Sequence, residues 1–102
     1  MLKLKPVERR SLRAQAHTLK PVAIIGEKGL TPTVMREIDW SLNRHELIKV
    51  KVVGKDRARR KNVLEEICSR LNAAPVQHIG NMLVIYRKIP EAEQAKKPHR
   101  PQ

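Results

Sequence analysis

An apolar run, a loop bracketed by glycines and a helical pattern follow one another over residues 22–45, and this succession limits the possible folds most. Residues 22–25, "VAII", carry β-branched side chains at three of four positions, so we expect a strand. An unbroken apolar run is typical of a strand that is buried on both faces, as in parallel sheets. The run therefore predicts an interior strand that leads through a short loop into a helix.

The helix after this loop has the clearest pattern in the chain. Thr31 suits its N-cap, because the hydroxyl can accept a hydrogen bond from the first turn, and Pro32 suits the first helical position. Apolar residues then repeat every four positions: Leu30, Val34, Ile38 and Leu42. We expect this helix to end near residue 44 or 45.

A second strand is predicted over residues 48–52, where apolar and basic residues alternate. Ile48, Val50 and Val52 would face the core. Lys49 and Lys51 would lie on the other face. A strand, a helix and a further strand in this order favour parallel pairing through a right-handed crossover.

The remaining elements complete an alternating order. We expect a helix from Pro6 to about residue 17, a third helix over residues 55–73, and a hairpin of residues 76–79 and 82–86 around Gly80 and Asn81. A glycine in the first turn position favours a type II′ turn. The apolar stripes of the two helices are Leu12, Ala16 and Leu19, and Val63, Leu64, Ile67, Cys68 and Leu71. The order α-β-α-β-α-β-β predicts an α/β two-layer sandwich with a four-stranded mixed sheet.

The domain is expected to span residues 1–89. Residues 90–102 contain three prolines and no apolar period, so we expect a disordered, basic and proline-rich tail.

The charge of the chain indicates its class of partner. Lys and Arg number 22 against 10 Asp and Glu, which leaves a formal net charge of +12. Such an excess attracts polyanions, so nucleic acid is the first expectation and an anionic membrane surface the second. Cys68 is the single cysteine, which excludes an internal disulfide and suits a reducing compartment. With no apolar run long enough for a membrane span and no secretory signal, we expect a soluble, cytoplasmic protein without membrane contact.

The scarcity of aromatic residues limits how nucleic acid can be contacted. Trp40 and Tyr86 are the only aromatic residues, and both are expected to pack. Proteins that stack successive bases on a sheet need several exposed rings. Charge and backbone must therefore supply most of the contacts.

The loop "GEKG", which comprises Gly26, Glu27, Lys28 and Gly29, has two interpretations. It is either a tight connection that needs a positive φ, or a place where bare backbone approaches a ligand. Backbone N–H groups at the start of the following helix favour an anion, and Lys28 can add a charge-assisted hydrogen bond. The spacing fits neither a P-loop nor a dinucleotide fingerprint, and the nearest analogy is the GXXG loop of KH domains.

Two clusters of basic residues are further candidates for contacts to phosphate. One cluster opens the third helix and consists of Lys55, Arg57, Arg59, Arg60 and Lys61. Positive charge at a helix N-terminus opposes the macrodipole, which indicates a role other than stability. The other cluster lies on the first helix and consists of Arg9, Arg10 and Arg13. A solvated charged surface is the alternative for both clusters, and Lys49 and Lys51 either protect an edge strand or line a sheet face.

Catalytic and metal-binding patterns are missing. The four histidines show no ligand spacing with Cys68, which is expected to be a buried structural thiol. No nucleophile with a base and no carboxylate pair stands out. We expect no enzyme, no metal and no cofactor.

Three phrases resemble the CRM domain, named for chloroplast RNA splicing and ribosome maturation, and its stand-alone bacterial YhbY-like members. They are "AHTLKPVAIIGEKGLT", "HELIKVK" and "VQHIGNMLVIYR", and the likeness covers roughly residues 5–89. The resemblance implies a fold similar to the C-terminal domain of translation initiation factor 3. It implies RNA binding through the GxxG loop, here residues 26–29, and association with the precursor of the large ribosomal subunit. We expect a monomer.

Two other classes of function stay open on the residues alone. The same charge would suit a DNA-binding architectural module. It would also suit a protein-interaction domain that docks on an acidic assembly partner.

Overall fold

A computed structural model of the chain describes residues 3–89. The elements are α1 (Pro6–Ala16), β1 (Pro21–Ile25), α2 (Pro32–His45), β2 (Leu47–Val52), α3 (Arg57–Leu71), β3 (Ala74–Ile79) and β4 (Met82–Tyr86). Their order confirms the predicted α-β-α-β-α-β-β succession. The tail predicted for residues 90–102 lies outside the described residues.

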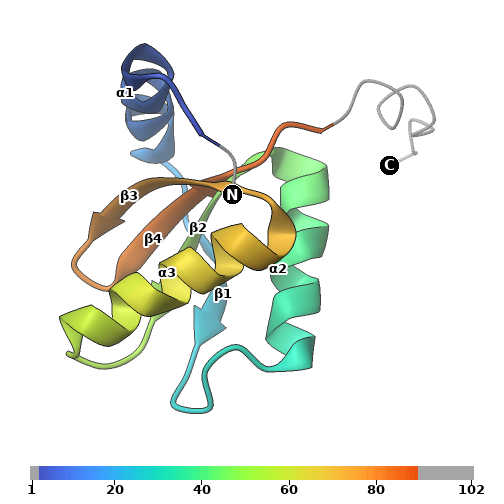
Figure 1. The fold of residues 1–102 in the computed structure, drawn as a ribbon, viewed down its shortest axis with the longest axis vertical. Helices are drawn as coiled ribbons and strands as arrows, with labels where there is room; N and C mark the ends of the chain where they lie inside the picture. Colours follow the sequence, from blue (N-terminus) through green and yellow to red (C-terminus); the bar gives the residue numbers. More distant parts are fainter. Residues whose placement is uncertain (1–2, 90–102) are drawn as a thin grey trace.

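The four strands form one mixed sheet in the order β1-β2-β4-β3. β1 and β2 are parallel, whereas β4 is antiparallel to both β2 and β3. Helices α2 and α3 cover one face of this sheet and form the main core with it (Figure 1). The alternation in β2 is as expected, because Ile48, Val50 and Val52 are buried in this core.

Helix α1 lies on the opposite face of the sheet, which we call the α1 face. Its Ala16 is buried against Leu47, Val76 and Val84, in a second and smaller apolar cluster. The predicted stripe of α1 is correct, because Leu12 and Leu19 pack on the same cluster. The cover is partial, and side chains at the ends of β1 and β3 stay exposed on the sheet.

The expectation that residues 22–25 are buried on both faces is wrong. Val22 is 41 % exposed and Ile24 is 60 % exposed, while Ala23 and Ile25 are buried under the helices. The reason is the position of the strand, because β1 forms an edge of the sheet and α1 packs mainly on β2, β3 and β4. One face of β1 therefore stays open.

A hydrogen bond confirms the predicted helix start, and backbone φ angles fit the predicted turn. The Thr31 hydroxyl accepts a hydrogen bond from the Val34 N–H at 3.2 Å. In the hairpin, φ of Gly80 is +55°, and Asn81 is not among the non-glycine residues of positive φ in the described part of the chain. This combination fits a type II′ turn and excludes type I′.

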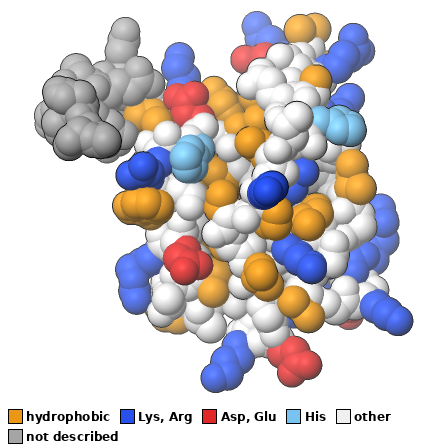
Figure 2. Space-filling model, turned by 180° about the vertical axis from the view of Figure 1, so that it is seen from behind, with side chains coloured by type: hydrophobic (Ala, Val, Ile, Leu, Met, Phe, Trp, Pro, Cys, Tyr) orange, Lys and Arg blue, Asp and Glu red, His pale blue; other side chains and the backbone are white. Residues whose placement is uncertain are grey.

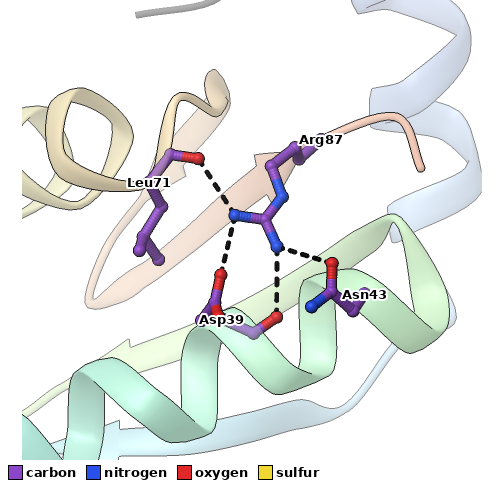
Figure 3. Close-up of polar contacts among 4 residues, drawn as sticks. All are labelled: Asp39, Asn43, Leu71 and Arg87. Carbon is purple, nitrogen blue, oxygen red and sulfur yellow. Dashed lines mark hydrogen bonds and ion pairs between the residues drawn. The ribbon is translucent and has the colours of Figure 1, made fainter. Parts of the chain in front are cut away.

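A single arginine ties the two covering helices together after the last strand (Figure 3). Arg87 donates hydrogen bonds to the Leu71 carbonyl at 3.0 Å, the Asp39 carbonyl at 3.2 Å and the Asn43 side chain at 2.9 Å. It also forms an ion pair with the Asp39 carboxylate at 2.8 Å. The end of α3 and the middle of α2 are therefore joined through the guanidinium of Arg87, whose side chain is 18 % exposed.

Cys68 lies in the core, as expected, and is fully buried. Burial raises the pKa of its thiol to about 12. No helix within residues 3–89 is both long and apolar enough to cross a membrane.

Candidate nucleic-acid interface

Three connections meet at one end of the sheet, which we call the loop end. Parallel strands finish at the same edge, so the loop after β1 (residues 26–31) and the loop after β2 (residues 53–56) are neighbours (Figure 1). The Val53 N–H donates to the Ile25 carbonyl at 2.9 Å. The turn between β3 and β4 joins them, because the Val52 N–H donates to the Asn81 carbonyl at 2.8 Å.

The two glycines of the GEKG loop have different reasons to be glycine. Gly29 has a φ of +76°, a conformation that residues with side chains rarely adopt. Its N–H closes a turn by donating to the Gly26 carbonyl at 3.0 Å. Gly26 has no positive φ, and a Cβ added there would meet no atom within 4 Å. Folding does not demand glycine at position 26, so the bare backbone there leaves open space for a ligand.

Backbone donors in this loop are available to such a ligand. The N–H groups of Glu27 and Lys28 have no acceptor within residues 3–89. Free N–H groups close to a helix N-terminus form a site that suits an anion such as phosphate. The start of α2 at Pro32 follows directly.

Arg59 lies between the two loops rather than in open solvent. Its guanidinium donates to the Gly26 carbonyl at 2.7 Å and to the Val53 carbonyl at 3.0 Å. Its backbone N–H is held by the N-cap residue of α3, because it donates to the Asp56 carboxylate at 3.1 Å. The side chain expected to contact phosphate thus holds the GEKG loop against the loop after β2.

Arg60 is also engaged by the protein. It donates to the Gly54 carbonyl at 3.0 Å and, through Nε, to Nε2 of His78 at 3.3 Å. Burial lowers the pKa of His78, and the charges of Arg57 and Arg60 lower it further, against the opposing effect of a hydrogen bond with the Gly80 backbone. The contact escaped sequence reasoning because the two residues are 18 positions apart and lie on different elements.

The pairing of His78 predicts a dependence of stability on pH. Because the pKa of His78 is lower in the folded state than its ordinary value of 6.5, the folded state resists protonation. The contribution of neutral His78 to the free energy of unfolding is fully present above pH 6.5. It is lost as the pH falls from 6.5 through the pKa that His78 has in the folded state. We expect the free energy of unfolding to decrease over this range, and urea titrations between pH 8 and 5 would measure it.

His78→Gln is the control for this pH effect, because glutamine keeps an acceptor for Arg60 but does not titrate. The variant should lose less stability than the wild type on acidification. An identical pH profile for both proteins would show that another group is responsible.

The other cations of the loop end have no acidic partner in the described part of the chain. These exposed residues are Lys28, Lys55, Arg57 and Lys61. Charges that are not neutralised internally keep a positive potential at the surface. The structure thus brings free cations and free backbone donors together at one end of the sheet.

Comparison with known proteins identifies the family. The model of the CRS1 / YhbY (CRM) domain matches residues 4–87. The chain belongs to this family. A Haemophilus influenzae protein named an RNA-binding protein is 44 % identical over 93 residues, which are 91 % of this chain and 94 % of the relative. A Pseudomonas aeruginosa protein named a probable RNA-binding protein is 42 % identical over 84 residues, which are 82 % and 81 % of the two chains.

A solved structure shows the same fold. The solution structure of the Staphylococcus aureus protein SAV1595, described as a candidate RNA-binding protein, matches this CRM domain with a TM-score of 0.78 and 34 % sequence identity. The match covers 90 % of this chain and 96 % of the other. The predicted α/β architecture of the CRM domain is therefore confirmed.

The arginines of α1 lie on the α1 face of the CRM domain and outside the loops of the loop end. Arg9, Arg10 and Arg13 belong to the helix that packs on the α1 face, whereas α2 and α3 cover the other face. Arg13 lies near Lys49 of β2, and both line a small pocket on the α1 face. The central position of β2 decides between the two roles considered for Lys49 and Lys51, because they line a sheet face rather than an edge.

Trp40 does not pack in the core of the CRM domain as expected. It is 60 % exposed on α2, and the guanidinium carbon of Arg44 lies 4.6 Å from the centre of its ring. Position 40 falls two residues after Ile38, which places it about 200° around the helix from the buried stripe. Tyr86 does pack, in the cluster beneath α1.

Proposed function

We propose that this CRM domain binds RNA at the loop end of its sheet. The observation that carries the proposal is the coincidence of unpaired N–H groups at Glu27 and Lys28 with four free cations in the surrounding loops. The RNA-binding names of its relatives support it. The chemistry needed is that of phosphate recognition, which depends on backbone donors and positive charge.

The mechanism follows from the division of roles among the basic residues. A phosphate would accept hydrogen bonds from the N–H groups of Glu27 and Lys28, with the N-terminus of α2 favouring its charge. Lys28 and Arg57 would neutralise this phosphate and its neighbours. Arg59 and Arg60 would mainly hold the loops, since their guanidinium groups already donate to protein acceptors. No step in this mechanism breaks a bond, so we propose binding without catalysis.

The biological partner is proposed from the resemblance to YhbY-like proteins. It is RNA of the precursor of the large ribosomal subunit, bound in the cytoplasm by a monomer that assists assembly. Crosslinking in cells, followed by mapping of the attached nucleotides, would test it. Crosslinks to messenger RNA alone would contradict the role in assembly while leaving RNA binding intact.

Lys28→Ala is expected to weaken binding to structured RNA roughly three- to tenfold at about 0.1 M salt, since one phosphate contact is lost. The slope of log K against log salt should become shallower by about 0.7 to 0.9. The free energy of unfolding should change by less than about 0.5 kcal/mol, because Lys28 is exposed and unpaired. Fluorescence anisotropy with labelled RNA at several salt concentrations would measure the affinity and the salt slope.

Lys20→Ala is the matched control, since Lys20 is exposed and precedes β1, at the end of the strand opposite to the GEKG loop. An equal loss in both variants would refute a localised contact and indicate a diffuse charge effect. Duplex DNA should compete poorly with structured RNA at fixed salt. Equal competition would favour the DNA-binding alternative.

A further inference from the structure

A small pocket lies on the α1 face, between helix α1 and strands β2, β4 and β3. Its volume is about 120 Å³. Ile79, Met82 and Val84 provide an apolar lining, and Arg13, Lys49 and Gln77 provide polar groups. Figure 2 shows the molecule from behind, with hydrophobic side chains and Lys and Arg side chains side by side on this face. The pocket is separate from the loops that carry the proposed phosphate contacts.

The strand register explains why these side chains meet. Lys49, Val84 and Gln77 are direct neighbours across β2, β4 and β3, and therefore lie in one row on the same face. The next row towards the loop end contains Lys51, Met82 and Ile79. In each row, a lysine of β2 thus lies beside an apolar residue of β4.

The polar groups of the pocket lack partners in the protein. The amide of Gln77, which is partly buried, forms no hydrogen bond within residues 3–89. Arg13 and Lys49 have no ion pair within these residues either. Among the residues that the structure describes, no group satisfies the Gln77 amide, so its donors and its acceptor are available to a ligand, and the two free cations beside it favour a ligand that also carries negative charge.

A pyrimidine nucleotide of RNA has this combination of groups. Its base is flat and apolar on its faces, and its edge carries donors and acceptors that a glutamine amide can match. The pocket, at about 120 Å³, is smaller than the cavity of about 150 Å³ that holds a benzene molecule, so it has room for one edge of a six-membered ring but not for a stack of bases. The phosphates beside such a base would meet Arg13 and Lys49.

We infer that this pocket binds a single unstacked pyrimidine of RNA, with the Gln77 amide contacting the edge of the base. The inference rests on the proposed RNA binding and extends it to a second contact. Along β2, Lys49 is followed by Lys51 and then by the loop after residue 52, so cations line the way from the pocket to the loop end. One strand of RNA would therefore reach both α1 and the GEKG loop.

The test compares two RNA strands of equal charge. One is a labelled 12-nucleotide strand of alternating uridine and cytidine, and the other has abasic sugars in place of all its nucleosides. Wild-type protein should bind the pyrimidine strand roughly three- to tenfold more tightly than the abasic strand at the same salt concentration. Gln77→Leu, which keeps the side-chain volume, should lose most of this preference and leave the salt slope unchanged.

Gln15→Leu is the matched control, because Gln15 is an exposed glutamine of α1 that lines a different pocket. It should behave like the wild type. In ¹H–¹⁵N spectra, the side-chain amide signals of Gln77 should shift on addition of the pyrimidine strand, and those of Gln15 should not.

The possible failures are distinguishable. Equal affinity of the wild type for both strands, with Lys28→Ala still weakening both, would overturn the base pocket and leave the proposed function standing. Equal binding of uridine 5′-monophosphate and the pyrimidine strand would replace an RNA site with a site for free nucleotides. Absence of binding to either strand and to structured RNA would overturn both proposals.

Discussion

Arg87→Ala is expected to lower the free energy of unfolding by about 3 kcal/mol, the largest effect of any single substitution predicted for this chain. The guanidinium satisfies the carbonyls of Leu71 and Asp39 as well as two side chains. Truncation leaves these acceptors without their charged donor in a partly buried place. The Asp39 carboxylate is about half exposed, so water recovers part of the loss.

Chemical denaturation of the purified variant would measure this effect. Arg70→Ala provides the comparison, because Arg70 forms an exposed ion pair with Glu66 at 3.0 Å one turn earlier in α3. Exposed pairs of this kind contribute little, so the change should stay within about 0.5 kcal/mol. Similar losses in the two variants would mean that Arg87 does not join the helices in solution.

Arg59→Ala is expected to reduce both stability and RNA binding. Losing the hydrogen bonds to Gly26 and Val53 should cost about 2 kcal/mol of folding free energy, because the donor is charged and the site is only partly exposed. The GEKG loop would then sample more conformations, and RNA binding would have to order it again. We expect affinity for structured RNA to fall by more than about tenfold, which exceeds the roughly three- to tenfold loss expected for a single phosphate contact.

Two companion variants separate the loop-holding role of Arg59 from its charge. Arg57→Ala removes an exposed cation two residues earlier and should weaken binding only about threefold, with stability unchanged. Arg59→Lys retains the charge, but an ammonium group lacks the planar fork that reaches both carbonyls. The lysine variant should therefore remain impaired, and full recovery of affinity would show that charge alone matters at this position.

Patterns that depend on neighbours in the sequence could be predicted. The alternation from Ile48 to Val52 identified the buried face of β2, and Thr31 identified the start of α2, because each depends on residues a few positions apart. The exposure of Ile24 could not be predicted in this way. It depends on the order of strands in the sheet, which is decided by contacts distant along the chain.

In the candidate site, too, features that depend on contacts distant along the chain could not be predicted from the sequence. Residues 55–61 form one basic cluster in the sequence, and nothing local separates Arg57 from Arg59. The fold separates them, because Arg59 and Arg60 reach carbonyls of neighbouring loops, whereas Arg57 stays exposed. The pocket beside Gln77 was also missed, since its lining comes from four elements. Roles in contact with RNA remain predictions for every one of these residues.

The buried position of Cys68 makes its thiol a natural probe of unfolding. Its thiol is fully buried, and its pKa of about 12 leaves almost no thiolate at neutral pH. A disulfide reagent must therefore wait until the core separates before it can react. Cys68 is the single cysteine of the chain. The rate at which a chromogenic disulfide reagent reacts with it would therefore report the unfolding of the unlabelled protein directly.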